Sequence, residues 1–365
     1  MVERTELWVN RKDLRATRIV NDTTPQLAEG EVLVAIDKFA LTANNVSYAV
    51  TGDIIGYWQF YPAEGDWGKV PVWGCADVVE SNCAELPAGE RIYGFFPMSS
   101  HAVLRPGNIT DEQFMDFAAH RKALPSLYNA YRRTRAEPQA VQDFENERCL
   151  LFPLFATSFF IYDYLQYNAL FGASQILIGS VSSKTGFGLA KMLFDDPSIG
   201  ATVIGITSAA NREFVQSLGC CHATMVYGEE EHINAQLPTA YIDMSGDGRL
   251  TAALHHHLGD QMRASIMVGA THWDQQHRQE ELPGAKPAFF FAPSHVQVRE
   301  KEWGQGVPMT KAMAASMQVA DAIVQIMQVE WLHGAPALQA NWVAMLDNKV
   351  PASRGLMVAL AEQGA

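Results

Sequence analysis

The chain has 365 residues, of which 27 are Lys or Arg and 40 are Asp or Glu, so its formal net charge is −13. Hydrophobic residues make up 48% of it, which is enough for a full core and excludes a disordered or fibrous protein. An acidic chain without a long Lys/Arg run is a poor nucleic-acid binder, and no apolar stretch reaches the roughly 18 uninterrupted residues of a membrane span. Glu3 and Glu6 stand where a signal peptide would be basic and then apolar. We therefore expect a cytoplasmic protein of two domains that binds neither nucleic acid nor membrane.

The first third of the chain is expected to be rich in strands. Residues 31–40 combine an apolar run with alternation, as a half-buried strand does, and residues 91–95 are a shorter candidate. From about residue 107 to 148 the sequence becomes more charged. There the pattern predicts helices over residues 111–122 and 128–135, interrupted by prolines.

The middle third alternates strands with helices. The expected strands are residues 175–178, 201–206, 223–227, 240–244, 264–268 and 288–291. The expected helices are residues 189–194, 211–218 and 249–258. Apolar strands that alternate with helices indicate an α/β fold with a doubly wound parallel sheet, covered on both faces. A long helix over 309–329 and a last strand over 354–360 follow.

The most informative segment is the turn after the strand at 175–178, where small residues open a helix. Unpaired N–H groups and the helix dipole make such a turn a phosphate site, and small residues let the backbone approach a pyrophosphate. The turn matches neither G-x-G-x-x-G nor the Walker pattern, and an ordinary Ser/Thr helix cap is the alternative. The candidate cofactor-binding residues are Ser180, Ser182, Ser183, Lys184, Thr185, Gly186 and Gly188.

The end of the second strand of this block indicates which cofactor would bind. NAD sites carry an acid about 20 residues beyond the glycine motif, but no acid stands at this strand end. Hydroxyl, amide and guanidinium groups stand there instead, as a 2′-phosphate requires, so we expect NADP(H). These groups belong to Thr207, Ser208, Asn211 and Arg212, although Arg212 could also be a solvated helix charge. Later strand ends offer Ser245, Gly246, Gly269 and Ala270 to border the nicotinamide.

The whole chain resembles the medium-chain dehydrogenase/reductase superfamily, and within it the zinc-free quinone oxidoreductases and enoyl reductases. The resemblance is carried by residues 31–36 with 41–52, by 72–79, by Leu-Pro-Ala-Gly-Glu-Arg-Ile-Tyr-Gly at 86–94, and by 208–227. It implies that Tyr227, at the end of the last of these segments, contacts the cofactor.

The resemblance also implies a domain order. A GroES-like β-barrel catalytic domain would comprise residues 1–150 and 308–365, with a helical insert at about 107–148. A Rossmann NADP-binding domain would comprise residues 151–307 and would form homodimers.

The chain departs from the superfamily in its metal ligands and its cofactor turn. Asn44, Asn45 and residues 72–75 stand where zinc-dependent members carry Cys and Gly-His-Glu, and the four-cysteine zinc lobe is missing. We therefore expect no metal. The turn over residues 182–188 is longer than the zinc-free Ala-x-Gly-Gly-Val-Gly and contains Lys184.

These features predict hydride transfer from NADPH to a small molecule such as a quinone or enone. Without zinc, a side chain or water must stabilise the oxyanion and supply the proton. By the resemblance, Tyr48 faces the nicotinamide, with Asn44 or Asn45 as hydrogen-bond donors and Lys184 acting on cofactor or acceptor. A core role for Tyr48 remains the alternative.

Two other functions and several residue clusters stay open. The chain could be a non-enzymatic NADPH sensor, whereas the absence of G-x-S-x-G argues against a hydrolase. The aromatic residues between 57 and 67 could wall a planar pocket or simply pack. His255, His256 and His257 are consecutive on a helix and cannot converge on one ion. His272 is a better site candidate. Cys220 and Cys221 could form a metal or redox site, but we interpret them as small buried residues.

Overall fold

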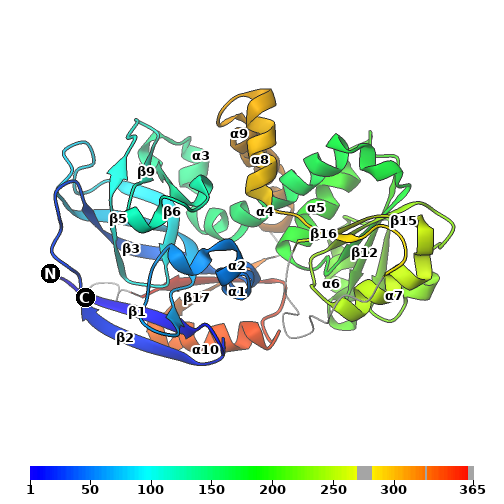
Figure 1. The fold of residues 1–365 in the computed structure, drawn as a ribbon, viewed down its shortest axis with the longest axis horizontal. Helices are drawn as coiled ribbons and strands as arrows, with labels where there is room; N and C mark the ends of the chain where they lie inside the picture. Colours follow the sequence, from blue (N-terminus) through cyan, green and yellow to red (C-terminus); the bar gives the residue numbers. More distant parts are fainter. Residues whose placement is uncertain (269–281, 325–326, 361–365) are drawn as a thin grey trace. The chain divides into compact units, whose positions relative to one another are not determined.

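The computed structural model describes residues 1–268, 282–324 and 327–360. The chain divides into two compact units (Figure 1). The first unit comprises Met1–Leu150 and Gln328–Ala365, and the second comprises Leu151–Met327. The first unit is therefore interrupted in sequence by the second. The second boundary falls later than the expected boundary after residue 307, because α9 (Val307–Val324) belongs to the second unit.

Two sheets build the described part of the first unit. The smaller has the order β2-β1-β4, with β1 at Glu3–Asn10, β2 at Thr17–Thr23 and β4 at Trp67–Gly68. The larger has the order β17-β18-β3-β5-β6-β10-β9-β8, and β7 also pairs with β3. Its strands are β3 (Val32–Leu41), β5 (Pro71–Ser81), β6 (Arg91–Pro97), β7 (His101–Leu104), β8 (Pro106–Gly107), β9 (Gln113–Asp116), β10 (Ala130–Arg133), β17 (Gln328–His333) and β18 (Arg354–Ala359). Closure of these strands into a barrel stays a prediction.

The helices of the first unit are short except for α10. They are α1 (Ala43–Val50), α2 (Gly52–Ile55), α3 (Gln139–Gln142) and α10 (Gly334–Leu346). Helix α4 (Glu145–Tyr167) begins in the first unit and ends in the second. By length and composition α4 is long and apolar enough to cross a membrane, but 67% of its most apolar window is buried, as in the core helix of a folded domain.

The prediction of helices over residues 111–122 and 128–135 is wrong. These residues form β9, β10 and short 3-10 turns, and β10 lies between β6 and β9 in the larger sheet, whereas α3 and the start of α4 follow later in the segment. Alternate side chains of β10 are buried, with Tyr131 at 0% and Arg133 at 5% exposure. The charges that suggested solvated helices are therefore partly internal: Arg133 pairs with buried Glu90 at 2.8 Å.

The second unit contains the doubly wound parallel sheet that the sequence predicts. Its strands are β11 (Gln175–Gly179), β12 (Thr202–Thr207), β13 (Ala223–Val226), β14 (Thr239–Asp243), β15 (Met262–Met267) and β16 (Pro287–Phe289). All neighbouring strands are parallel, in the order β13-β12-β11-β14-β15-β16. Taken in chain order this is 3-2-1-4-5-6, the order of dinucleotide-binding sheets. The α/β fold class is confirmed.

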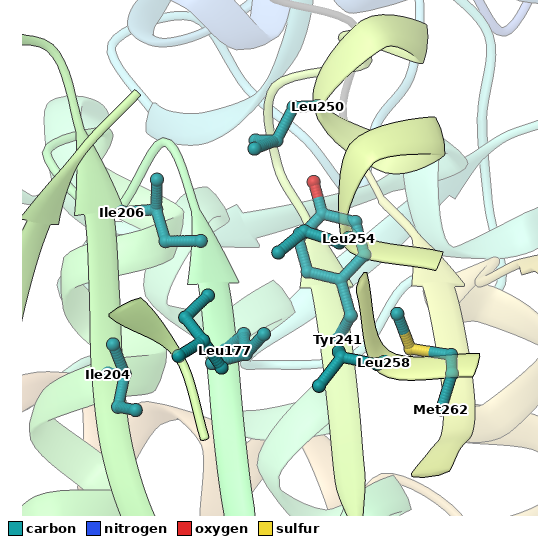
Figure 2. Packing of buried hydrophobic residues seen from close by; sticks show 9 residues of the cluster. Leu177, Ile204, Ile206, Tyr241, Leu250, Leu254, Leu258 and Met262 are labelled. Atoms are coloured by element: carbon teal, nitrogen blue, oxygen red, sulfur yellow. The ribbon is translucent and has the colours of Figure 1, made fainter. Parts of the chain in front are cut away.

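Helices α5 (Lys184–Asp195), α6 (Arg212–Ser217) and α7 (Gly248–Leu258) lie between strands of this sheet in the chain, and α8 (Ala292–Trp303) and α9 follow its last strand (Figure 1). Figure 2 shows Leu250, Leu254 and Leu258 of α7 against the sheet residues Leu177, Ile204, Ile206, Tyr241 and Met262. Because β11 and β14 are buried along their whole length, only their ends are available to a ligand.

Candidate functional site

The turn between β11 and α5 has a tightly defined backbone. Ser180 directly follows β11 and has a φ of 54°, in the left-handed region that non-glycine residues rarely adopt. The carbonyl of Ser180 accepts a hydrogen bond from the N–H of Ser183 at 2.9 Å. Ser183 is the N-cap of α5, and its hydroxyl accepts from the N–H of Gly186 at 3.1 Å. The turn therefore leads directly into a helix N-terminus, as the sequence predicts, and Ser183 forms the helix cap that was the alternative to a phosphate site.

Two glycines of α5 are required by close packing. A Cβ on Gly186 would lie 2.8 Å from the carbonyl oxygen of Ser180 and 2.9 Å from the Cα of Val181. A Cβ on Gly188 would lie 2.7 Å from the Phe155 ring and from the Ser158 hydroxyl of α4. The same hydroxyl donates to the carbonyl of Thr185 at 2.7 Å. These contacts hold the first turn of α5 against both the preceding turn and α4.

Polar side chains from β12 and the segment after it meet the β11–α5 turn. The buried hydroxyl of Ser182 accepts hydrogen bonds from the Thr207 hydroxyl at 3.1 Å and from the Asn211 amide at 3.3 Å. Ser208 follows Thr207, and its carbonyl accepts from the N–H of Asn211 at 3.0 Å. The structure thus brings together residues that the sequence assigned separately to pyrophosphate and to 2′-phosphate binding.

Arg212 is held by an acid that the sequence analysis did not select. One Nη of Arg212 forms an ion pair with Glu229, whose carboxylate also accepts from the N–H of Val226 at 2.9 Å. Glu229 stands three residues beyond the end of β13, which is the neighbour of β12 in the sheet. Carboxyl ends of neighbouring parallel strands meet at one edge, and that rule could have identified this acid.

Burial shifts the pKa values of both Lys184 and Tyr227. Lys184 is the first residue of α5, and burial lowers the pKa of its ammonium group to about 8. Burial raises the pKa of Tyr227 to about 12, although a hydrogen bond with Ser180 opposes the rise. The N–H of Tyr227 donates to the carbonyl of Thr207 at 3.0 Å. Both residues therefore lie in the cluster where the sequence predicted cofactor contacts.

The end of β14 is organised around a buried acid that was also missed. Asp243 accepts from the hydroxyl of Ser245 at 2.6 Å and from the N–H groups of Ser245 at 2.8 Å and Gly246 at 3.0 Å. Burial raises the pKa of Asp243, and these hydrogen bonds oppose the rise. The N–H groups of Ser245 and Gly246 are thus engaged within the protein. Gly269, Ala270, His272 and Trp273 lie outside the described residues.

In the first unit, Tyr48 of α1 has a buried ring and a hydrogen-bonded hydroxyl. Its oxygen accepts from the Asn44 amide at 2.7 Å and from the Trp73 indole N–H at 3.2 Å. The ring is 5% exposed, whereas Asn44 and Trp73 are both half-buried. A buried ring with a hydrogen-bonded hydroxyl matches the core role that the sequence left as the alternative for Tyr48. Burial raises the pKa of Tyr48 well above its ordinary value, more than these hydrogen bonds lower it.

Asn45 has a structural role in the cap of α1. Its side-chain oxygen accepts from the N–H of Thr42 at 2.7 Å, and its amide donates to the carbonyl of Pro71 at 2.9 Å. The side chain is 2% exposed. Of the two asparagines that the sequence offered as donors, Asn44 is the one that contacts Tyr48.

The aromatic residues after α2 pack into the core of the first unit. Tyr57, Trp58, Phe60 and Tyr61 are all buried. The ring centroids of Tyr57 and Tyr48 are 4.5 Å apart, and the Tyr57 hydroxyl lies 2.8 Å from that of Tyr128. These four side chains pack in the core, which was the alternative to a pocket wall.

The histidine and cysteine clusters are also explained by packing. His255 is fully buried, with Nδ1 2.8 Å from the carbonyl of Pro283 and Nε2 2.9 Å from the Ser265 hydroxyl. Cys220 is buried, and its sulfur lies 3.8 Å from that of Cys221. Within residues 1–268, 282–324 and 327–360, no three His, Cys, Asp or Glu side chains are grouped as metal ligands would be.

Comparison with known proteins places the chain in a family and defines its fold. A family model described as "Protein of unknown function (DUF2855)" matches residues 39–351, and the chain belongs to this family. No curated protein sequence matches it.

Solved structures of oxidoreductases share the fold. The CurK enoyl reductase is 14% identical over 98% of this chain and 99% of its own, with a TM-score of 0.57. CurA from Vibrio vulnificus in complex with NADPH is 12% identical over 98% and 99%, with a TM-score of 0.59. The yhdH oxidoreductase from Salmonella enterica in complex with NADP is 13% identical over 98% and 100%, with a TM-score of 0.55. The chain therefore has the fold of these three proteins.

Proposed function

We propose that this chain is an NADP(H)-dependent oxidoreductase that works without zinc and transfers hydride to a quinone, an enone or a similar activated carbonyl compound. The observation that carries the proposal is the capped Ser/Gly turn at the carboxyl end of β11, the first strand of a sheet in dinucleotide-binding order. The chain also shares its fold with proteins crystallised with NADPH or NADP, which supports NADP(H) as the cofactor.

The residues around this turn fit NADP(H). Gly186 lets the first turn of α5 pack against the backbone of Ser180 and Val181, where a Cβ would collide, and so keeps the helix N-terminus next to the turn. Arg212 has a buried Nε without a hydrogen-bond partner in the described part of the chain. We assign the pyrophosphate to Ser180, Ser182, Ser183 and the first turn of α5, and the 2′-phosphate to Ser208, Asn211 and Arg212. When bound, NADPH supplies the hydride.

Tyr48 is the proton donor in this proposal. Two N–H groups donate to its oxygen, so the proton of the hydroxyl remains to be donated to an acceptor. Because its pKa is raised, the phenol stays protonated throughout the neutral range, although the same shift makes it a weaker acid. The described residues show no three-ligand metal cluster, and we therefore assign stabilisation of the substrate oxyanion to Tyr48 and Asn44.

The test is NADPH oxidation against a panel of quinones, enones and aldehydes, with Tyr48→Phe as the variant. We expect turnover with at least one acceptor, and a loss of about 100-fold in kcat for the variant with unchanged affinity for NADPH. The control is Tyr61→Phe, which removes a buried hydroxyl that donates to the carbonyl of Phe95. NADPH binding without turnover of any acceptor would refute the enzyme and favour an NADPH-binding sensor.

We further propose that the second unit forms a homodimer through the open edge of its sheet. β16 is the last strand in the order, and in the described residues its outer edge has no partner strand. Phe289 of β16 is 52% exposed beside a hollow of about 240 Å³ whose lining includes Phe290, Phe291 and Val298. β16 has only three residues and begins with Pro287, so we expect the exposed apolar side chains rather than backbone pairing to make the contact. Sedimentation velocity of the wild type should give a dimer, and a monomer at micromolar concentration would refute this arrangement.

A further inference from the structure

Glu229 places an acid beside the end of β12, although the sequence at that strand end contains none. The strand end of β12 carries no acid, which is why the sequence predicts NADP(H) rather than NAD(H). In the folded chain, the turn after β13 brings Glu229 to Arg212, the residue assigned to the 2′-phosphate. An acid and a guanidinium thus occupy the same position, although dinucleotide sites ordinarily use one or the other for the two cofactors.

The backbone orients Glu229 toward Arg212, and solvent reaches both side chains of the ion pair. The Glu229 carboxylate is fixed by the N–H of Val226 at 2.9 Å and forms an ion pair with one Nη of Arg212. Their side chains are 35% and 38% exposed, so a ligand can reach the pair. A pair this exposed adds little to stability, and a role in ligand binding explains its position better.

We propose that Glu229 is a specificity-determining residue that limits the preference of this site for NADPH over NADH. The inference rests on the proposed function, because it concerns the same cofactor site. A 2′-phosphate is an anion and must compete with the carboxylate for Arg212. A ribose 2′-hydroxyl can instead donate a hydrogen bond to the carboxylate. Glu229 therefore opposes NADPH and favours NADH, while Arg212 does the reverse.

The Glu229→Gln variant isolates the charge. Glutamine keeps the size of the side chain and an oxygen that accepts from Val226, but it carries no negative charge. The matched control is Glu231→Gln in the same turn. Its side chain is 81% exposed, and its ion-pair contact is with His232 at 3.9 Å rather than with Arg212. The control removes the same net charge without changing the pair.

The measurement is the dissociation constant of NADPH and of NADH, by fluorescence titration of the full chain. Calorimetry with adenosine 2′,5′-bisphosphate and with AMP reports the 2′-phosphate contribution separately. For Glu229→Gln we expect the ratio of the NADH constant to the NADPH constant to rise about 5- to 20-fold, and the bisphosphate to bind more tightly, since one opposing charge is removed. Glu231→Gln should stay within about twofold of the wild type.

Each outcome decides a separate question. A wild type that binds NADPH and a Glu229→Gln ratio that is unchanged or lower would overturn the role of Glu229 and leave the proposed function intact. A wild type that binds none of the four probes would overturn both. Glu229→Ala is a second variant if the first fails to fold, and its ratio should rise in the same direction. An equal rise in Glu231→Gln would reduce the effect to net charge and would also overturn the proposal.

Discussion

Arginine–carboxylate pairs occur in both units of the chain, but water reaches them to very different degrees. In the first unit, Arg121 and Asp116 lie 3.2 Å apart with 1% exposure each. In the second unit, Arg212 and Glu229 form a pair in which both side chains are more than one-third exposed. The chemistry of the two pairs is the same, whereas their burial differs.

Burial decides what such a pair can do. The guanidinium of Arg121 also donates to the carbonyl of Phe60 at 3.2 Å and to the Tyr131 hydroxyl at 3.0 Å, so it is committed to the core of the first unit. Removing one member of a buried pair leaves an uncompensated charge. The pair at the sheet edge can exchange a partner for a ligand at small cost, because solvent already screens it. We therefore assign folding to the first pair and cofactor choice to the second.

The largest expected effect follows from breaking the buried pair. Arg121→Met should lower the free energy of unfolding by about 3–5 kcal/mol, because Asp116 keeps its charge at a buried position. Urea unfolding at neutral pH measures this loss. Arg135→Met is the control: Arg135 is 60% exposed, and its partner Glu90 retains Arg133, so its change should stay below about 1 kcal/mol. Equal losses of unfolding free energy in Arg121→Met and Arg135→Met would show that burial does not determine how much these ion pairs stabilise the fold.

A smaller effect is expected in the cofactor turn. The methyl group of Gly186→Ala would press on the backbone of Ser180 and Val181, so the turn must move. We expect a loss of about 1–3 kcal/mol in stability and at least about tenfold weaker NADPH binding. Gly200→Ala is the control, since a Cβ there meets nothing within 4 Å. Unchanged NADPH affinity in Gly186→Ala would show that this turn does not hold the cofactor.

The smallest of these effects concerns a network of intermediate burial. Glu145 at the start of α4 accepts from Arg91 at 2.7 Å and pairs with Lys38 at 2.9 Å. Burial raises the pKa of Glu145, but these hydrogen bonds outweigh it and lower the pKa from 4.5 to about 2. A carboxylate whose pKa is lower in the folded chain than in the unfolded chain stabilises the fold at any pH above its unfolded pKa. This stabilisation is lost as the pH falls toward the folded pKa of about 2.

Glu145→Gln should therefore lower the stability at pH 7 by about 1 kcal/mol, after allowance for solvent screening, and by less at pH 3. Urea unfolding at both values provides the comparison. Glu147→Gln in the same helix, whose side chain has no ion pair among the described residues, should show no such pH dependence. A loss for Glu145→Gln that stays constant from pH 7 to 3 would contradict the assignment of the stabilising charge.

The two units also differ in how far sequence alone predicts them. The strands of the second unit are short apolar runs separated by helices, and the turn at 180–186 is defined by neighbours in sequence, so local pattern predicts both. Arg133 is different. It points into the core because Glu90, 43 residues away, supplies its partner. Without knowledge of that long-range pair, the charges around it suggest a solvated helix.

The candidate site shows the same limit. Ser182, Thr207 and Asn211 were identified because each lies next to a strand end, and the structure joins them by hydrogen bonds. Glu229 was missed because it becomes relevant only when β13 pairs with β12 and brings it to Arg212. Asp243 was missed for another reason: its contacts with Ser245 and Gly246 are local, but the strand pattern does not show that its carboxylate is buried.

The most direct test of the central claim is hydrogen–deuterium exchange of the wild type with and without NADPH. We expect slower exchange of backbone amides over residues 180–188 and 207–212, where the turn and the end of β12 would contact the cofactor. We expect no change over residues 113–133, which include the buried pair of the first unit. NADPH binding that leaves residues 180–188 and 207–212 unprotected would contradict the central claim.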